Sequence, residues 1–428
     1  MIDLRRIREN PQAIMDALSK RGMQNAKELV DEIYTLDLEK RRIQAQLEEV
    51  SSRLNSLNSM HKTINHPLHQ TATVSIGLEQ KEATHHLKEK HKILMGVYKS
   101  CESALLEKLY QLPNLPAQEI PIGKNAKDNQ IIYQVANLPA VKPGDAAHWD
   151  LIKKYDLVDF ELGNKITGAG FPLYQGRGAR LQRALISFFL DKAVEAGYLE
   201  VQPPILVNAA SAYATGQLPD KEGQIYHITA DDLYLIPTAE VSITNMYRDY
   251  IVDLAELPIK CAGYTPCFRR EAGSWGADVR GLNRLHQFDK VELVQICHPD
   301  HSYRQLEEML TYVRSLLEQL ELPYRVVQLC TGDLGFCAAM TYDIEVYSVA
   351  QDRWLEVSSI SNFETFQANR LALRYKDKKK KSHLLHTLNG SALALPRIMA
   401  ALLECNQNPL GISIPKVLQV YTGFDCIV

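Results

Sequence analysis

Two long stretches near the start of the chain carry apolar residues at the spacing of a coiled coil. In the first stretch the positions alternate steps of four and three residues, with one polar position at Lys40. They are Leu29, Ile33, Leu36, Lys40, Ile43, Leu47, Val50, Leu54 and Leu57. A heptad pattern of this length predicts a helix that packs along another helix. Neither proline nor glycine occurs from residue 25 to residue 60, so nothing in the sequence interrupts this helix.

The second stretch has the same spacing and predicts a helix that ends before Pro113. Its expected seam is Ala83, Leu87, Lys90, Leu94, Val97, Cys101 and Ala104. Between the two stretches, residues 65–77 contain Pro67 and several β-branched residues, which favours a turn. Two helices joined by one turn run antiparallel, and about 30 residues of helix extend about 45–50 Å. We therefore expect a helical hairpin domain over residues 1–112, followed by a second domain over residues 113–428.

The end of this hairpin is more basic than the rest of the chain. From Arg53 to Lys92 there are six Lys or Arg against three Glu, and six of the thirteen histidines, while the whole chain has a net charge of −3. A basic tip on an acidic protein favours contact with a polyanion. Oligomerisation, or membership of a larger helical bundle, is the alternative that the pattern leaves open.

The second domain reads as a mixture of short strands and helices. Five prolines between residues 113 and 143 indicate a linker that leads into it. The expected strands are Leu233–Ile236, Val291–Ile296, Tyr324–Gln328 and Ile344–Tyr347, and the expected helices are Arg180–Ala196, His301–Gln319 and Ser391–Cys405. Because several strands follow one another with helices at irregular intervals, we expect an α+β domain with a mostly antiparallel sheet.

Composition excludes several other classes of protein. Hydrophobic residues make up 46% and charged residues 23% of the 428 residues, which is typical of a globular protein and not of a disordered or collagen-like one. The longest uninterrupted apolar run, 398–403, is too short for a membrane helix, and the start MIDLRRIREN lacks the features of a secretion signal. None of the eight cysteines forms a C-x-x-C pair. We therefore expect a cytoplasmic protein with reduced thiols, and neither a membrane partner nor bound zinc.

A dense group of arginines and carboxylates points to a nucleotide site. Neither a P-loop nor a G-x-G-x-x-G motif is present, so the parallel-sheet nucleotide folds are disfavoured. The group consists of Phe268-Arg269-Arg270-Glu271, Arg280-Gly281-Leu282 and Arg284 to Glu292. Guanidinium groups of this kind can hold a triphosphate, an aromatic ring such as that of Phe288 can stack on a base, and carboxylates can hold a metal or an amine.

A second set of polar residues lies near the end of the chain. Leu388-Asn389-Gly390-Ser391 is expected at the start of a helix that carries Arg397 two turns further on. Considered without further context, both this set and the arginine group could also be networks of surface ion pairs.

The order of these motifs over residues 1–428 resembles the bacterial-type seryl-tRNA synthetases, a family of class II aminoacyl-tRNA synthetases. The resemblance is carried by several short segments along the chain. They are Met1-Ile2-Asp3-Leu4, Gly178–Leu185, Gly197–Val207 (similar to motif 1, the dimer-interface element), Thr238-Ala239-Glu240-Val241, Phe268–Glu292 (motif 2), Glu356-Val357-Ser358-Ser359 and His386–Arg397 (motif 3). The resemblance implies ATP-dependent activation of L-serine and transfer of the seryl group to tRNA(Ser), with tRNA(Sec) as a further substrate. It also implies a homodimer.

The resemblance also implies roles for individual residues. The implied catalytic residues are Arg269, Glu271 and Arg397; the implied serine ligands are Thr238, Ala239, Glu240, Arg269, Glu292, Asn389 and Ser391; and the implied ATP ligands are Arg269, Arg270, Glu271, Arg284, Phe288, Glu356, Val357, Ser358, Ser359 and Arg397. Glu356 and Ser359 would hold Mg²⁺, a hard cation that takes oxygen ligands. No general base is expected, because the substrate carboxylate is already a nucleophile.

Some positions differ from the family pattern. Pro396 and Ala392 stand where glycine is common, and Ile360 where many relatives carry cysteine. Asp220–Gln224 replaces an acidic-aromatic stretch in a loop expected over the substrate. Lys376–Lys381, with five lysines, is interpreted as a solvated loop, with a contact to the acceptor stem of tRNA as the alternative.

Two functions from other classes of protein are the alternatives to a seryl-tRNA synthetase. An enzyme with the same adenylation chemistry could load a carrier protein, but such relatives lack the long arm. A tRNA-binding paralogue without catalysis would be expected to have lost some of Arg269, Glu271, Glu292, Glu356 and Arg397, and all five are present.

Overall fold

The computed structural model describes residues 1–64, 74–139, 145–272 and 280–428, and the side chains at 58 and 60–80 are outside this description. The chain divides into two compact units. One contains residues 4–19 and 23–112, and the other contains residues 1–3, 20–22 and 113–428.

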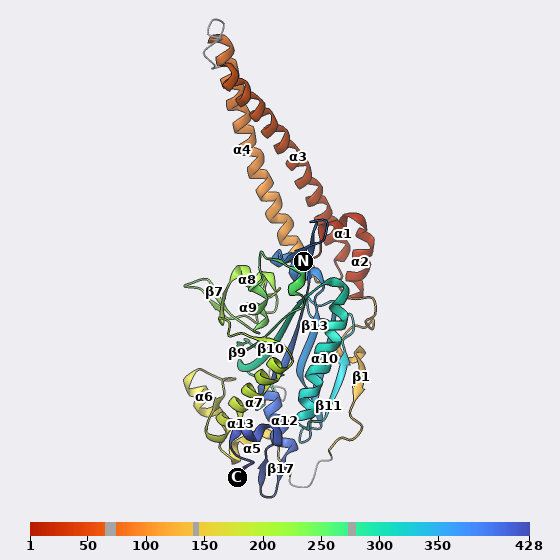
Figure 1. Cartoon of the computed structure of the whole chain (residues 1–428), viewed down its shortest axis with the longest axis vertical. Coiled ribbons are helices and arrows are strands. Elements are labelled where there is room, and N and C mark those ends of the chain that lie inside the picture. Colours follow the sequence, from red (N-terminus) through yellow and green to blue (C-terminus); the bar gives the residue numbers. More distant parts are fainter. Residues whose placement is uncertain (65–73, 140–144, 273–279) are drawn as a thin grey trace. The chain divides into compact units, whose positions relative to one another are not determined.

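The first unit is built on a pair of long helices, α3 (Ala26–Ile64) and α4 (Val74–Gln111), which lie side by side in Figure 1. The two helices are antiparallel, because Lys108 pairs with Glu32 near one end while Lys40 pairs with Glu102 further along. The α4 helix ends before Pro113, as expected. It begins at Val74, so residues 74–77 belong to this helix and not to the turn. The rest of the expected turn, 65–73, lies outside the described residues, and so do most side chains of the basic tip.

The seam of the first helix follows the sequence prediction, but that of the second is shifted. Leu29, Ile33, Ile43, Leu47 and Val50 are buried in α3. In α4 the positions shared with the prediction are Leu87, Leu94, Cys101 and Ala104, whereas Ala83, Lys90 and Val97 are exposed. Their places are taken by Thr84, His91 and Tyr98, each one residue later. Tyr98 packs with Ile43 and Leu47, since its larger ring covers more apolar surface than Val97 could.

Two short helices that the sequence analysis did not predict precede the hairpin, α1 (Leu4–Glu9) and α2 (Pro11–Lys20). They bury Ile7, Ile14 and Leu18. Asp37 of α3 is 2% exposed, and its carboxylate accepts hydrogen bonds from Arg8 of α1 and Arg41 of α3 at 2.6–3.0 Å. Burial alone would raise the pKa of Asp37, but the two arginines hold it below its usual value. The ion pair between the exposed Arg8 and the buried Asp37 links α1 to α3.

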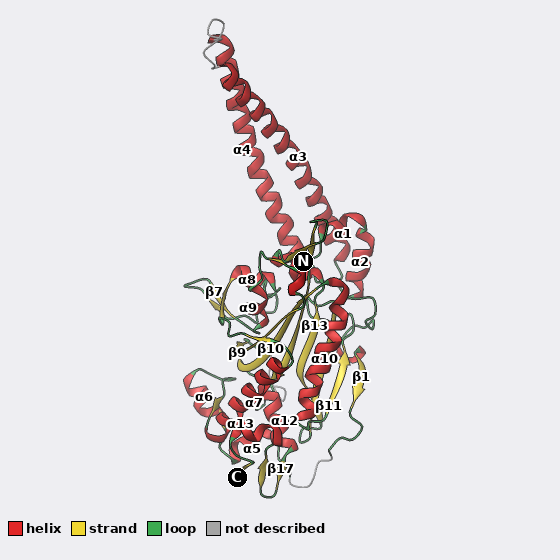
Figure 2. Cartoon of the chain, viewed as in Figure 1, coloured by secondary structure: helices red, strands yellow, loops and turns green. Residues whose placement is uncertain are grey.

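The second unit is built around an eight-stranded sheet (Figure 2). In spatial order its strands are β1 (Gln130–Gln134), β11 (Tyr324–Gln328), β12 (Met340–Ser348), β13 (Arg353–Asn362), β16 (His386–Ala394), β10 (Gln287–Cys297), β9 (Ile259–Phe268) and β4 (Leu199–Glu200). Neighbouring strands are antiparallel, except that β4 pairs with β9 in parallel. The expected α+β fold with a mostly antiparallel sheet is confirmed.

Four smaller sheets surround this large one. They are formed by β15 (Ser382–Leu384), β14 (Arg374–Lys376) and β8 (Ile251–Val252); by β17 (Gln407–Asn408), β18 (Gly411–Ser413) and β19 (Cys426–Ile427); by β2 (Val158–Asp159) and β3 (Leu173–Tyr174); and by β5 (Leu206–Asn208), β7 (Leu233–Leu235) and β6 (His227–Ile228). The expected strands at 233–236, 291–296, 324–328 and 344–347 all lie within observed strands or end one residue from them.

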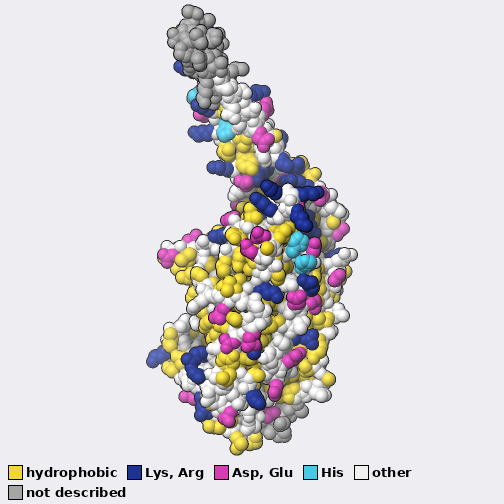
Figure 3. Space-filling view, in the orientation of Figure 1, with side chains coloured by type: hydrophobic (Ala, Val, Ile, Leu, Met, Phe, Trp, Pro, Cys, Tyr) yellow, Lys and Arg dark blue, Asp and Glu magenta, His cyan; other side chains and the backbone are white. Residues whose placement is uncertain are grey.

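The helices of this unit pack on the large sheet and at its ends. They are α5 (His148–Lys154), α6 (Phe160–Ile166), α7 (Gly176–Glu195), α8 (Ala209–Ala214), α9 (Glu240–Asn245), α10 (Ser302–Gln319), α11 (Thr365–Leu371), α12 (Leu395–Cys405) and α13 (Lys416–Thr422). The α10 helix lies along β13 and β16. Figure 3 shows acidic and basic side chains interspersed on the visible face of this unit.

The prediction of a helix over residues 391–405 was wrong at its start. Residues 391–394 continue β16, and α12 begins at Leu395. Ser391 pairs with Glu292 of β10 across the sheet, so the ladder of hydrogen bonds extends past the point where the sequence suggested a helix. Pro396 lies in the first turn of α12, where its missing N–H does not cost a helical hydrogen bond.

Candidate active site

A cavity of about 540 Å³ lies over the central strands of the large sheet. It is on the face opposite to α10: a side chain at Gly390 would come within 2.7 Å of Met309 of α10, and the adjacent Asn389 and Ser391 point the other way. Most of the residues predicted for the site line this cavity. They are Thr238, Glu240, Arg269, Glu271, Arg284, Phe288, Glu356, Val357, Ser358, Ser359, Asn389, Ser391 and Arg397.

Three predicted site residues lie elsewhere. Glu292 is fully buried directly beneath the cavity, where Asn389 and Ser391 contact it. Ala239 is fully buried and forms the N-cap of α9. The Arg270 side chain is exposed and does not line the cavity; its backbone N–H donates to the carbonyl of Gln224 at 2.8 Å.

One end of the cavity is a buried cluster of carboxylates and amides. Asn389 donates to Glu240 Oε2 at 2.9 Å and to Glu292 Oε1 at 3.0 Å, and Ser391 donates to Glu292 Oε2 at 3.2 Å. Gln367 donates to Glu240 Oε1 at 2.6 Å. The Asn389 carbonyl oxygen Oδ1 is buried and has no hydrogen-bond partner among the described residues, so it is available to a donor on a ligand.

Lys290 supplies the positive charge in this cluster. Its Nζ lies 2.6 Å from Glu292 Oε2 and donates to Thr238 Oγ1 at 2.9 Å. Lys290 is not among the site residues predicted from the sequence, although it lies two residues before Glu292 on one strand and so shares its face. Burial, and secondarily the charge of Glu292, raise the pKa of Glu240 to about 7. The cluster therefore holds two acids against one base and can accept one more positive charge.

The other end of the cavity carries arginines and an aromatic ring. The Arg269 guanidinium lies over the Phe288 ring, with Cζ 5.3 Å from the ring centroid. Arg284 forms an ion pair with Glu271. Arg397 of α12 donates from Nε to the carbonyl of Asn283 at 2.9 Å and from Nη1 to the carbonyl of Glu356 at 2.5 Å. These three arginines all line the cavity, where they suit a polyphosphate.

The loop that departs from the family pattern also contributes to the cavity. Gly216, Gln217, Pro219 and residues 220–222 and 224 all line it. The Asp220 carboxylate accepts hydrogen bonds from the backbone N–H groups of Gln224 and Ile225 at 3.0 and 2.9 Å, so it shapes the turn by itself. Although the stretch at 220–224 departs from the family pattern, the loop therefore still lies against the site.

Oxygen donors at the edge of the cavity fit a divalent cation. Glu356 and Ser359 line it, and Asp343 of β12 is paired with Ser359 across the strands. Asp343 Oδ1 is buried without a hydrogen-bond partner among the described residues. Burial and the nearby Glu356 raise the pKa of Asp343 well above its usual value. Carboxylate and hydroxyl oxygens grouped in this way suit a hard metal ion such as Mg²⁺. Asp343 is not among the site residues predicted from the sequence.

The fold and the site together define the catalytic core of a class II aminoacyl-tRNA synthetase. The family model described as "tRNA synthetase class II core domain (G, H, P, S and T)" matches residues 226–406, and the one described as "Seryl-tRNA synthetase N-terminal domain" matches residues 1–116. A serine–tRNA ligase of Salinibacter ruber is 48% identical, with 99% of this chain and 98% of the relative covered. The chain belongs to the seryl-tRNA synthetase family.

Other relatives agree with this assignment. A serine–tRNA ligase of Akkermansia muciniphila is 44% identical over 100% of this chain and 99% of its own. Among solved structures, the seryl-tRNA synthetase of Pyrococcus horikoshii complexed with ATP superposes with a TM-score of 0.89 at 32% identity, covering 100% of this chain and 99% of that one.

Two further observations concern membranes and metals. Among the described helices, none combines the length and the apolarity that crossing a bilayer requires. Among all residues that the structure describes, no three His, Cys, Asp or Glu side chains are grouped so as to hold a metal ion. That the protein works in the cytoplasm and does not need zinc stays a prediction.

Proposed function

We propose that this chain activates L-serine with ATP to form seryl-adenylate and then transfers the seryl group to tRNA(Ser). The observation that carries this proposal is the buried cluster in which Glu292 accepts hydrogen bonds from both Asn389 and Ser391. A small polar side chain suits this cluster, and an apolar one would leave its polar atoms without partners.

The charge of the cluster supports an amino acid as its ligand. Glu240 and Glu292 carry two negative charges when ionised, and Lys290 neutralises one of them. A substrate ammonium group supplies the missing positive charge, and the Asn389 Oδ1 atom and Thr238 hydroxyl can accept its hydrogen bonds. Glu292 with Ser391 would then bind the serine hydroxyl. Alanine and glycine lack this hydroxyl and would bind much less tightly.

The arginines and Phe288 support ATP as the second ligand. Phe288 offers a ring face to adenine, Arg397 and Arg269 approach the phosphates, and Arg284 can leave Glu271 to reach the γ-phosphate. Glu356 and Ser359, with Asp343 behind them, would hold a Mg²⁺ ion that neutralises phosphate charge. Glu271, once freed from Arg284, can accept hydrogen bonds from the amino edge of adenine.

The chemistry of the first step needs position and charge rather than a general base. A serine carboxylate oxygen attacks the α-phosphorus of ATP, the bond to the β-phosphate oxygen breaks, and pyrophosphate leaves with that electron pair. Arg269 stabilises the charge that develops on the α-phosphate. In the second step a hydroxyl of the terminal tRNA ribose attacks the seryl carbonyl, the bond between that carbonyl carbon and the phosphate oxygen breaks, and AMP leaves with the electron pair while its phosphate takes the hydroxyl proton. Transfer to tRNA(Sec) would follow the same chemistry and stays a prediction.

The hairpin supports the choice of tRNA as the acceptor. Its apolar seam is buried between α3 and α4, since Ile43 and Leu47 of one helix pack with Cys101 and Tyr98 of the other. The packed hairpin therefore leaves its outer faces for a partner. A carrier-protein acceptor offers no reason for an arm of this length.

A homodimer is proposed from a different part of the chain. The segment that resembles motif 1 contains β4, which is an edge strand of the large sheet. Leu199 of β4 is 61% exposed, which is unusual for a leucine on a sheet edge and favours an interface between two copies.

The proposal is tested by ATP–pyrophosphate exchange with serine, alanine, threonine and cysteine in turn. We expect exchange with serine to exceed that with alanine by at least ~1,000-fold in kcat/KM, because a site that binds a hydroxyl rejects a substrate that lacks it. Equal exchange with alanine or threonine would contradict the proposed specificity. Absence of exchange with any of the four would favour a non-catalytic paralogue.

A further inference from the structure

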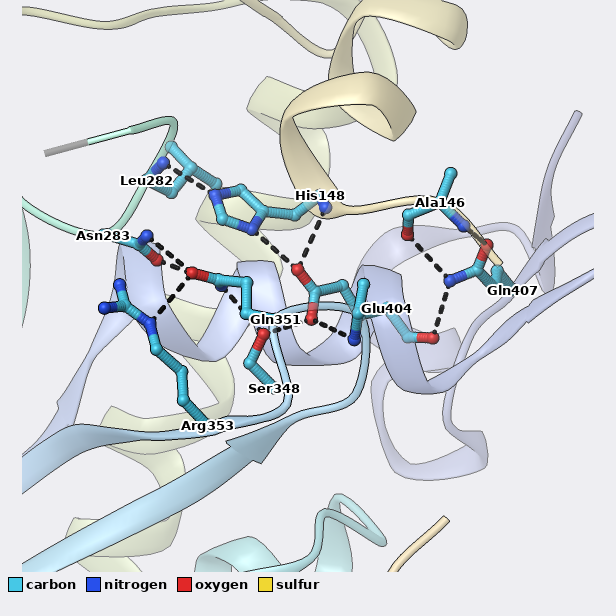
Figure 4. Close-up of polar contacts among 10 residues, drawn as sticks. Ala146, His148, Leu282, Asn283, Ser348, Gln351, Arg353, Glu404 and Gln407 are labelled. Carbon is cyan, nitrogen blue, oxygen red and sulfur yellow. Dashed lines mark hydrogen bonds and ion pairs between the residues drawn. The ribbon is translucent and has the colours of Figure 1, made fainter. Parts of the chain in front are cut away.

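We propose that Glu404 and His148 are positioning residues of the active site, which hold residues 282–284 in place and through them the guanidinium of Arg397. This inference rests on the proposed use of ATP. Neither residue lines the cavity, and both side chains are fully buried. Figure 4 shows the polar network that connects them to the cavity wall.

Both oxygens of the Glu404 carboxylate begin a chain of hydrogen bonds. Oε1 accepts from the backbone N–H of His148 at 3.0 Å and lies 2.8 Å from its Nδ1. On the other side of the ring, the backbone N–H of Leu282 donates to His148 Nε2 at 2.9 Å. Because Nε2 accepts a hydrogen bond, the ring proton is on Nδ1, and it is donated to Glu404.

The second chain starts at Oε2 and ends one residue further along the same segment. Oε2 accepts from the Ser348 hydroxyl at 2.5 Å, and the Gln351 amide donates to that hydroxyl at 2.8 Å. Gln351 in turn accepts from the Asn283 side chain at 2.9 Å. The two chains from one carboxylate therefore end on two adjacent residues, Leu282 and Asn283.

The held segment connects directly to the arginines of the site. The carbonyl of Asn283 accepts from Arg397 Nε at 2.9 Å, and the next residue is Arg284. Residues 282–284 line the cavity. Arg397 and Glu404 lie seven residues apart on α12, two turns along the same face of the helix. One face of α12 thus supplies both a predicted ATP ligand and the anchor of the segment that orients it.

Packing around the network leaves it little freedom. Gly281 has φ +63°, and a side chain there would come within 2.3 Å of His148 Nε2. Arg280 covers the ring of Trp149, the residue after His148, with Cζ 4.2 Å from the ring centroid. Burial alone would raise the pKa of Glu404, but hydrogen bonds from His148 and Ser348 keep it below its usual value. The carboxylate therefore stays charged and keeps all its donors oriented.

Two single substitutions of His148 distinguish a positioning role of its side chain from a packing role. His148→Asn can keep a donor near Nδ1 for Glu404 but is too short to reach Leu282, whereas His148→Gln can place a carbonyl oxygen near Nε2 for the Leu282 N–H. We expect the Asn variant to raise the KM for ATP in the exchange reaction by at least ~10-fold, since small displacements of a positioning group cost one to two powers of ten. The Gln variant keeps the acceptor for Leu282 but loses the donor to Glu404, so it should raise the KM for ATP by less than the Asn variant does, and the KM for serine should stay within about twofold in both.

Controls distinguish this effect from loss of stability. Leu317→Ala in the buried face of α10 should lower the thermal midpoint and leave the KM for ATP unchanged. Gln351→Ala removes the second chain at a half-buried position, so it should fold even where a change of His148 does not, and it should raise the KM for ATP.

The outcomes are separable. A KM for ATP within twofold of wild type in folded His148→Asn, or equal effects in this variant and Leu317→Ala, would overturn the inference. If His148→Asn does not fold, an unchanged KM for ATP in Gln351→Ala overturns it. Wild-type protein without serine-dependent exchange would instead contradict the proposed function.

Discussion

Two buried carboxylates, Glu240 and Glu292, both accept hydrogen bonds from the Asn389 amide. Their closeness affects the pKa of Glu240. Burial and the charge of Glu292 raise the pKa of Glu240 to about 7. The site without substrate therefore releases the Glu240 proton only near neutral pH, and a bound ammonium group would favour that release.

This raised pKa predicts a pH dependence of serine binding. Below pH 7 Glu240 is mostly protonated and attracts an ammonium group less, so the KM for serine should rise about tenfold from pH 8 to pH 6. The serine ammonium stays protonated throughout this range, and the KM for ATP serves as the internal control. A KM for serine that stays constant from pH 8 to pH 6 would contradict the assigned role of Glu240.

Arg269 provides a second test at the same scale. Arg269→Ala should lower the rate of serine-dependent ATP–pyrophosphate exchange by at least ~100-fold with the protein still folded, since the guanidinium faces the charge that develops on the α-phosphate. Arg304→Ala, at an exposed position of α10 on the other face of the sheet, is the matched control. Exchange within a few-fold of wild type in Arg269→Ala would refute the assignment of this motif.

At the level of single residues, the sequence predicted the site residues that lie in short motifs. It missed those that only the fold brings close to the site. Lys290 could have been found, because alternation along a strand places it beside Glu292. The contact of His148 with Glu404 joins positions 256 residues apart, and that of Gln367 with Glu240 joins positions 127 apart. Contacts over such separations follow from the packing of several elements and have no local signal.

At the scale of elements, the heptad spacing predicted both hairpin helices but not the register of α4. Val97 and Tyr98 compete for the same seam position, and a count of apolar residues does not decide between them. The start of α12 was misplaced for a similar reason: Ser391 and Ala394 fit either structure by propensity, and their pairing with β10 decides in favour of a strand.

The lysine-rich hairpin between β14 and β15 carries a prediction of its own. The Asp377 carboxylate accepts hydrogen bonds from the backbone N–H groups of Lys379 and Lys381 at 2.9 and 2.8 Å, so the turn keeps its shape without a bound partner. The side chains of Lys378–Lys381 are exposed. On the interpretation as a solvated loop, replacing lysines 378, 379 and 381 by Gln and Lys380 (φ +61°) by Asn should leave the KM for tRNA within about twofold.

The alternative for this hairpin is a contact with the acceptor stem. A large rise in the KM for tRNA that added salt reproduces in the wild-type enzyme would favour that contact, because phosphate contacts weaken steeply with salt. The KM for serine measured in parallel would show whether the variant retains an intact active site.

At the scale of the whole molecule, the two units divide the proposed function. The cavity and every residue placed in it belong to the unit that contains residues 113–428, and the α3–α4 hairpin belongs to the other. The hairpin buries its own seam and holds α1 through Asp37, so it requires no contact with the cavity to fold. Activation of serine and choice of tRNA are therefore expected to be separable.

The most direct test of this account measures both reactions in one variant. Residues 55–90 are deleted, the shortened helices are joined by a tight turn, and serine-dependent ATP–pyrophosphate exchange is compared with charging of tRNA(Ser). We expect exchange to stay within about threefold of the full chain and charging to fall by at least ~100-fold, because the lost arm would supply the tRNA phosphate contacts. Near-normal charging of tRNA(Ser) by the shortened enzyme would contradict the account.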